Sequence, residues 1–183
     1  MKPFLLLAVL VAGLSPAAVS SPPFKVRTLP IAMLAQDSDL IIEATVTKVE
    51  VGASGTRVAR CTPTATWKGQ PNEVVEFLAS PTWACDISTA VPGERVVLFL
   101  EVDEAGQLCI FHSGRGRMPR RELAGREYAT FHGEISFPEN TVTTFDKHVA
   151  GSYNQGVEIG ELKRLVAQAI EAARQAAEQG AGK

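Results

Sequence analysis

The chain has 183 residues, a length that favours a single domain over two. Lysine and arginine together number 18 against 20 acidic residues, which gives a formal net charge of -2 at pH 7. A mildly acidic chain lacks the basic surface that binds phosphate backbones, so we expect no nucleic-acid partner.

The first twenty residues have the pattern of a secretory signal peptide. Lys2 provides a positive charge, and residues 4–14 form an apolar run that is shorter than the roughly 20 residues needed to span a membrane. Ala18 and Ser20 place small residues at the −3 and −1 positions of a cleavage site. We therefore predict a signal peptide over residues 1–20, a secreted or periplasmic protein, and no membrane span.

The next segment is predicted to be extended first and helical afterwards. Residues 21–28 begin with Ser-Pro-Pro, and proline disfavours helix, so we expect an extended N-terminal segment. Thr28 is then predicted to cap a short helix that has Pro30 in its first turn. The residues that share the apolar face of this helix are Ile31, Leu34 and Ala35.

Three strands are predicted after the short helix. Residues 40–51 are apolar on both faces at first and alternate later, as a strand does when it leaves the core for an edge. Residues 56–67 contain Pro63, which has no N–H and therefore indicates an edge or a bulge. Residues 72–78 form the third predicted strand.

The stretch from Cys85 to Pro119 is predicted to hold the central hairpin of the fold. Residues 96–102 run almost unbroken through branched and aromatic side chains, which indicates a strand buried on both faces. A polar turn at 103–106 leads to a further strand at 108–112. These are the fourth and fifth predicted strands.

A basic run and a second, short hairpin are predicted beyond the central hairpin. We interpret the basic run as the solvated face of a loop, with an anion site as the alternative. Residues 131–137 and 141–145 flank a Pro-Glu-Asn turn, which indicates a satellite hairpin. The arginines of the basic run are Arg115, Arg117, Arg120, Arg121 and Arg126.

The last predicted element is an amphipathic helix. Apolar residues recur at i, i+3, i+4 and i+7 spacing from Ile159 to Ala173, which places them on one stripe. We expect this helix to cover one open side of a barrel. We also expect the domain to occupy residues 29–175 and to leave 176–183 as a flexible tail.

These elements are the parts of a mainly β (α+β) fold, a five-stranded barrel of the oligonucleotide/oligosaccharide-binding (OB) type with a short leading helix and a closing helix. Three motifs occur in order: SDLIIEATV at residues 38–46, Trp-Lys-Gly at 67–69, and Cys85 followed by PGERVVLF at 92–99. This order resembles secreted bacterial domains similar to the netrin module and the tissue inhibitors of metalloproteinases. The resemblance covers residues 29–120 and implies the same barrel.

The cysteines show where the chain departs from that family. The family's inhibitors begin with a cysteine whose amine and carbonyl chelate the protease's zinc, whereas residues 21–30 contain no cysteine. That mechanism is therefore not carried over. The resemblance pairs the regions of Cys85 and Cys109, so we predict this disulfide, while the residues alone leave Cys61 open as a partner of either.

No catalytic residue, cofactor site or metal site is predicted. The three histidines show no i, i+4 pair, and no G-x-S-x-G is present. Four aromatic side chains could line a carbohydrate groove, although a core position is preferred for the first of them. The histidines are His112, His132 and His148, and the aromatic residues are Trp67, Trp83, Tyr128 and Tyr153.

The sequence as a whole predicts a secreted, non-enzymatic binding domain with an unknown protein or carbohydrate partner. Two alternatives remain open from the residues. One is a divergent protease inhibitor, and the other is an exported hydrolase with an unrecognised site.

Overall fold

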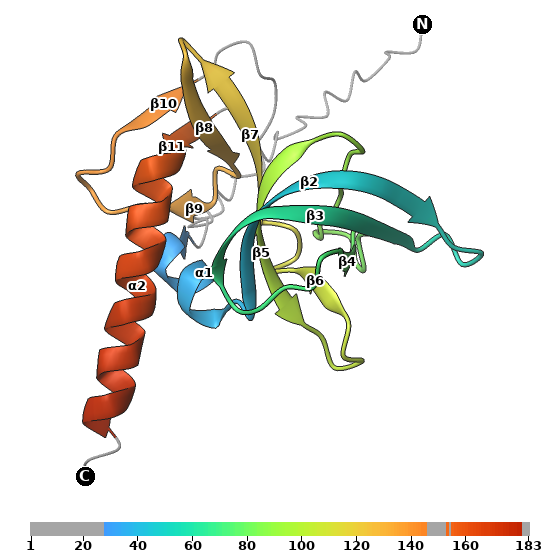
Figure 1. The fold of residues 1–183 in the computed structure, drawn as a ribbon, viewed down its shortest axis with the longest axis horizontal. Helices are drawn as coiled ribbons and strands as arrows, with labels where there is room; N and C mark the ends of the chain where they lie inside the picture. The colour runs from blue at the N-terminus through green and yellow to red at the C-terminus, as the bar shows by residue number, and fades with distance from the viewer. Residues whose placement is uncertain (1–27, 146–152, 154, 181–183) are drawn as a thin grey trace, which may run out of the picture.

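The computed structural model describes residues 28–145, 153 and 155–180. Eleven strands and two helices lie within them, and the predicted fold class is confirmed (Figure 1). The protein is mainly β, with a closed five-stranded barrel, a short N-terminal helix and a C-terminal helix. The predicted signal peptide and residues 21–27 of the predicted extended segment lie outside the described residues.

Two helices and eleven strands follow one another along the chain. The helices are α1 (Ile31–Asp37) and α2 (Ile159–Gly180). The strands are β1 (Leu29–Pro30), β2 (Leu40–Val51), β3 (Arg57–Lys68), β4 (Val75–Leu78), β5 (Arg95–Val102), β6 (Leu108–Ile110), β7 (Arg117–Leu123), β8 (Arg126–Phe131), β9 (Ile135–Ser136), β10 (Thr143–Phe145) and β11 (Gln155–Glu158).

The barrel is a ring of five strands in the order β2-β3-β4-β6-β5. Every pairing in it is antiparallel except that between β4 and β6, which is parallel. The register of β2 on β3 shifts beside Pro63, which confirms the bulge expected there. The barrel interior is filled by a cluster of buried side chains that includes Ile42, Val46, Phe77, Leu98 and Ile110.

A second core lies on the outer face of the β2–β5 wall. Ile41 and Ile42 are both 0% exposed because neighbouring strand residues point to opposite faces, and each face of this wall is covered. The outward set, which includes Ile41 and Phe99, packs with Leu34 of α1 and Leu162 of α2. The two helices lie side by side on this side of the molecule (Figure 1).

The position expected for the closing helix was therefore wrong. Leu162 and Val166 bury against the outer wall rather than over an open side of the barrel, because that wall is apolar on both faces. The helix also runs to Gly180, past the predicted end at residue 175. Arg174 pairs with Glu171 at 2.8 Å and with Glu178 at 2.7 Å, and such i, i+3 and i, i+4 pairs support a helix.

Three local predictions also need correction. The N-cap of α1 is Pro30 and not Thr28, although the buried face of the helix is as expected. The satellite hairpin is absent from the described residues, because β9 pairs with β1, and β10 pairs with β11. The basic run from Arg117 onward is strand and not loop, since β7 and β8 form a hairpin that continues the sheet beyond β5.

No helix in the described part of the chain is long and apolar enough to span a membrane. The long helix α2 shows why. Only one of its faces is apolar, and charged residues such as Arg164 and Arg174 occupy the other.

Candidate functional site

The barrel wall is most weakly paired along one seam, between β4 and β6. Leu78 and Cys109 form the single residue pair between these strands in the described part of the chain. The β2–β3 pairing, in contrast, extends from Ile41 to Val51 on β2. Closure of the barrel at the seam therefore depends on one pair of residues.

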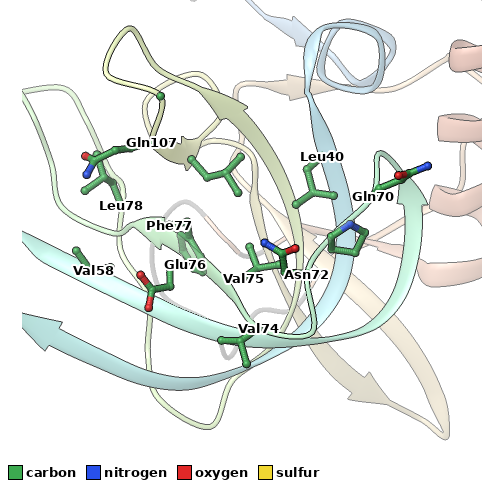
Figure 2. Close-up of a pocket in the computed structure, with 13 residues that line it drawn as sticks. Leu40, Val58, Gln70, Asn72, Val74, Val75, Glu76, Phe77, Leu78 and Gln107 are labelled. Atoms are coloured by element: carbon green, nitrogen blue, oxygen red, sulfur yellow. The ribbon is translucent and has the colours of Figure 1, made fainter.

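A groove of about 500 Å³ runs along this seam, and we call it the seam groove. Figure 2 shows side chains from several segments around its opening. Its lining comes from residues 70–72 before β4, residues 74–78 on and next to β4, residues 106–108 at the β5–β6 turn, Leu40 and Val58. All these residues are described by the structure.

The lining of the seam groove includes residues from both faces of β4. Val75 and Phe77 point into the barrel and belong to its buried cluster. Glu76 lies between them in the strand and points outward, as does Val58 on the neighbouring strand. A continuous sheet presents only one of its faces to a cavity, so a lining from both faces indicates an exposed strand edge.

The hydrogen-bond pattern of β4 shows which backbone groups face the slot. The N–H of Ala79 donates to the carbonyl of Arg57 at 3.0 Å, which makes these residues a hydrogen-bonded pair. Such pairs alternate along antiparallel strands, so Phe77 and Val75 also direct their backbone groups at β3. The backbone N–H and C=O groups of Leu78 and Glu76 therefore point away from β3. Leu78 is paired with β6, and the N–H and C=O of Glu76 face the seam groove.

The polar side chains of the seam groove are mostly amides at its rim. Gln70, Asn72 and Gln107 are exposed, whereas Phe77 is only 2% exposed in the floor. Amides both donate and accept hydrogen bonds, so they suit a ligand that carries both kinds of group. An apolar floor with a few convergent polar groups is the usual character of a binding site.

The three cysteines are free thiols in the structure, so the Cys85–Cys109 disulfide is not formed there and stays a prediction. Cys61 points into the barrel, and burial raises its pKa to about 12. Cys109 points outward, with its Sγ 3.6 Å from the carbonyl of Glu101. Burial, helped by the nearby carboxylates, raises the pKa of Cys109 to about 11. A disulfide between Cys109 and Cys61 would require Cys61 to leave the core. The exposed Cys85 is therefore the favoured partner of Cys109.

The histidines do not assemble a metal site or a catalytic pair in the described residues. No group of three potential His, Cys, Asp or Glu ligands occurs there. The strand predicted to reach His112 ends at Ile110, and His112 and Ser113 lie in a turn with φ of 51° and 55°. The Nδ1 of His132 accepts the N–H of Glu134 at 3.3 Å, and burial lowers the pKa of this histidine, so its role is structural. His148 lies outside the described residues.

The aromatic residues do not form a shared platform. Trp67 packs against the second core and donates to Glu43 at 3.0 Å, which confirms the preferred core interpretation. Trp83 is 56% exposed and donates from Nε1 to the hydroxyl of Ser113 at 3.1 Å. The described lining of the seam groove includes neither tryptophan nor tyrosine.

The basic run is built into the structure, so its interpretation as a solvated loop face was wrong. Arg120 pairs with Glu43 at 2.7 Å and also with Glu127. Arg117 donates to Glu94 at 3.1 Å. Glu43 and Glu94 are 77 and 23 positions away from their arginines, which is why the arginine spacing did not reveal these pairs. The carboxylates also occupy the guanidinium groups of Arg117 and Arg120, two of the arginines that the anion-site alternative required. Arg115, a further member of the run, pairs with Glu134, whereas Arg121 and Arg126 are exposed.

Sequence reasoning missed the seam groove. Residues 72–78 were predicted as one strand, whereas β4 begins only at Val75. Gln70 and Asn72, which precede it, form part of the groove rim, and the pair Pro71-Asn72 was the available signal for a later strand start. A scan against protein-family models and a search of curated proteins found no match for this chain.

Proposed function

We propose that this chain is an exported, non-enzymatic binding domain that holds an extended polypeptide segment in the seam groove. The observation that carries this proposal is the free edge of β4, where the N–H and C=O of Glu76 face a slot with an apolar floor. Unpaired strand edges readily bind another strand.

The mode of binding follows from the geometry of β4. A polypeptide segment in extended conformation forms main-chain hydrogen bonds with an exposed strand edge, and pockets for alternate side chains select its sequence. In the seam groove, Glu76 provides the backbone groups. Leu40, Phe77 and Leu108 provide an apolar floor for side chains of the ligand.

A polypeptide is favoured over a carbohydrate by the composition of the groove. Sugar rings are commonly stacked on exposed tryptophan or tyrosine, which the described lining does not contain. The rim amides of Gln70, Asn72 and Gln107 match peptide groups, which both donate and accept. The resemblance to the netrin module and to protease inhibitors also favours a protein partner.

The test is a selection of extended peptides from a random library on the mature protein, followed by Glu76→Pro. Proline removes an N–H that faces the groove and not β3, so the barrel should tolerate it as edge strands do. We expect the affinity of selected peptides to fall about 5- to 10-fold, because one hydrogen bond contributes about 1 kcal/mol. Peptide binding is measured by fluorescence anisotropy, and folding by circular dichroism.

The matched control is Glu76→Gln, which keeps the backbone N–H and the length of the side chain. A neutral peptide should bind this variant as it binds the parent. The proposal is contradicted if selected peptides bind Glu76→Pro and the parent equally well. It is contradicted as well if the selection yields no peptide.

A further inference from the structure

We infer that the seam groove takes an uncharged segment of another protein as a strand inserted between β4 and β6, with main-chain hydrogen bonds to both of them. This inference rests on the proposed function, because it concerns the occupant of the same groove. It is carried by the backbone groups on the β6 side of the groove and by the charges of the residues that line it.

The start of β6 directs its backbone groups alternately at β5 and at the groove. The N–H of Asp103 donates to the carbonyl of Gln107 at 2.8 Å, and the N–H of Gln107 donates to the carboxylate of Asp103 at 2.8 Å. Both backbone groups of Gln107 are therefore held by the β5–β6 turn. Hydrogen-bonded pairs alternate along antiparallel strands, so Leu108, which lies opposite Val102, directs its N–H and C=O away from β5.

The N–H of Leu108 is left on the β6 side of the seam groove, which Leu108 lines. The pair Leu78–Cys109 joins β4 to β6 beyond the groove. A parallel ladder that continued from it toward the start of β4 would pair Phe77 with Leu108, and the described residues contain no such pair. The groove therefore has backbone groups on both sides, those of Glu76 on β4 and the N–H of Leu108 on β6.

A segment between these two edges is hydrogen-bonded on both of its sides, as a central strand of a sheet is. Exposed strand edges accept an added strand through such main-chain bonds. β4 has four residues, so a segment of about four residues matches its length. The inserted segment would replace the pairing that β4 and β6 do not make, and it would complete the barrel wall.

The groove presents no free charge to such a segment. Its described lining contains one carboxylate, that of Glu76, and no lysine, arginine or histidine. Glu76 pairs with Arg60 at 2.6 Å, so its charge is already balanced. A charged side chain of the ligand would lose water in the groove without gaining a partner of opposite sign, which costs free energy. The occupant that fits is therefore uncharged.

The alternation of side chains in a strand specifies the segment further. Successive side chains point to opposite faces, so every second side chain of the ligand points into the barrel. There it meets Val75 and Phe77 of the buried cluster, which favours an apolar residue. The side chains between them point outward, where uncharged polar residues suit the amides of the rim. These amides belong to Gln70, Asn72 and Gln107.

Amide hydrogen exchange at Leu108 tests the insertion. The probe is the tightest-binding peptide from the library selection, added at about 100 times its Kd. We expect exchange at Leu108 to slow at least about tenfold, because a ligand at this concentration can reduce the free form about 100-fold. The amide of Gln107 is the internal control, because Asp103 holds it in the free protein, and its exchange should be unchanged.

The composition of the selected peptides tests the absence of charge. In peptides selected on the mature protein, we expect lysine, arginine, aspartate and glutamate to be depleted about tenfold relative to the starting library. Arg60→Gln removes the partner of Glu76, so selection on this variant should recover lysine and arginine about 2- to 5-fold more often than selection on the parent. Arg126→Gln is the matched control, because Arg126 is exposed and pairs with Glu158 outside the groove. It should select the same peptides as the parent.

The outcomes separate this inference from the proposed function. If the peptide protects Glu76 and not Leu108, the segment is added to β4 alone, so the insertion is wrong and the proposed function stands. Selected peptides that are rich in charged residues would overturn the uncharged occupant in the same way. A selection that yields no peptide removes the proposed function and this inference together. If the mature protein dimerises and Leu108 is protected in the dimer without peptide, the occupant is a second copy of the chain, which overturns a foreign segment.

Discussion

Gly114→Ala is expected to destabilise the protein by about 3–5 kcal/mol, the sum of backbone strain and a steric clash. Gly114 has φ of +88°, where a residue with a Cβ is disfavoured. A Cβ at this position would also lie 2.3 Å from the backbone nitrogen of Ser88 and 2.5 Å from the carbonyl carbon of Ile87. Neither backbone can move alone, because the N–H of Ile87 donates to the carbonyl of Ser113 at 3.0 Å.

Gly125→Ala separates the two contributions. Gly125 has φ of +75°, but nothing lies within 4 Å of a Cβ built there. We therefore expect this variant to lose only about 1–2 kcal/mol, the cost of the backbone conformation. Urea unfolding of both variants provides the measurement. Equal losses of stability would show that the 111–116 turn is not packed against residues 87–88 as described.

Arg120→Ala is expected to cost about 3–5 kcal/mol, because it would leave a buried carboxylate without its partner. The side chains of Arg120 and Glu43 are only 8% and 12% exposed. When the guanidinium is removed, the carboxylate of Glu43 keeps a single hydrogen-bond donor, the indole Nε1–H of Trp67 at 3.0 Å. The expected result is a large decrease in the urea midpoint without a change in fold.

The matched control is Arg126→Ala, which removes an arginine from the same hairpin. Its partner Glu158 is 3.4 Å away, and the two side chains are 68% and 49% exposed. Exposed pairs contribute about 0–1 kcal/mol, so this variant should be nearly as stable as the parent. A comparable loss in the two variants would contradict the burial of Arg120.

The effect of Arg120→Ala should also depend on pH. Desolvation by itself would raise the pKa of Glu127, but the guanidinium groups of Arg120 and Arg95 outweigh it and lower that pKa. A lowered pKa stabilises the folded state above the carboxyl's ordinary pKa, and this contribution is lost as the pH falls through the folded value. The stability difference between the parent and Arg120→Ala should therefore narrow in acid.

The barrel strands could be predicted because their pattern is local. Ile41 and Ile42 are apolar neighbours, and so are Val97 and Leu98. A strand with such pairs must be covered on both faces. The structure covers one face with the barrel interior and the other with α1 and α2. The position of α2 could not be predicted, because its apolar stripe fits either surface.

The ion pairs and the seam groove could not be predicted because they depend on contacts between distant residues. Glu43 and Arg120 are 77 positions apart, and nothing in the spacing of the arginines indicates a buried acid. The groove depends on where β4 and β6 separate, which is a property of register. Its components, such as Asn72 and Gln107, are ordinary loop residues in the sequence.

The central claim is that the outer edge of β4 is open and is completed by a bound polypeptide segment. Amide hydrogen exchange, measured by NMR, tests it most directly at two neighbouring residues. In the free protein the amide of Phe77, which faces β3, should exchange slowly, and that of Glu76, which faces the groove, should exchange rapidly. Addition of the selected peptide should slow Glu76 and leave Phe77 unchanged. Equal protection of both amides in the free protein would contradict the open seam.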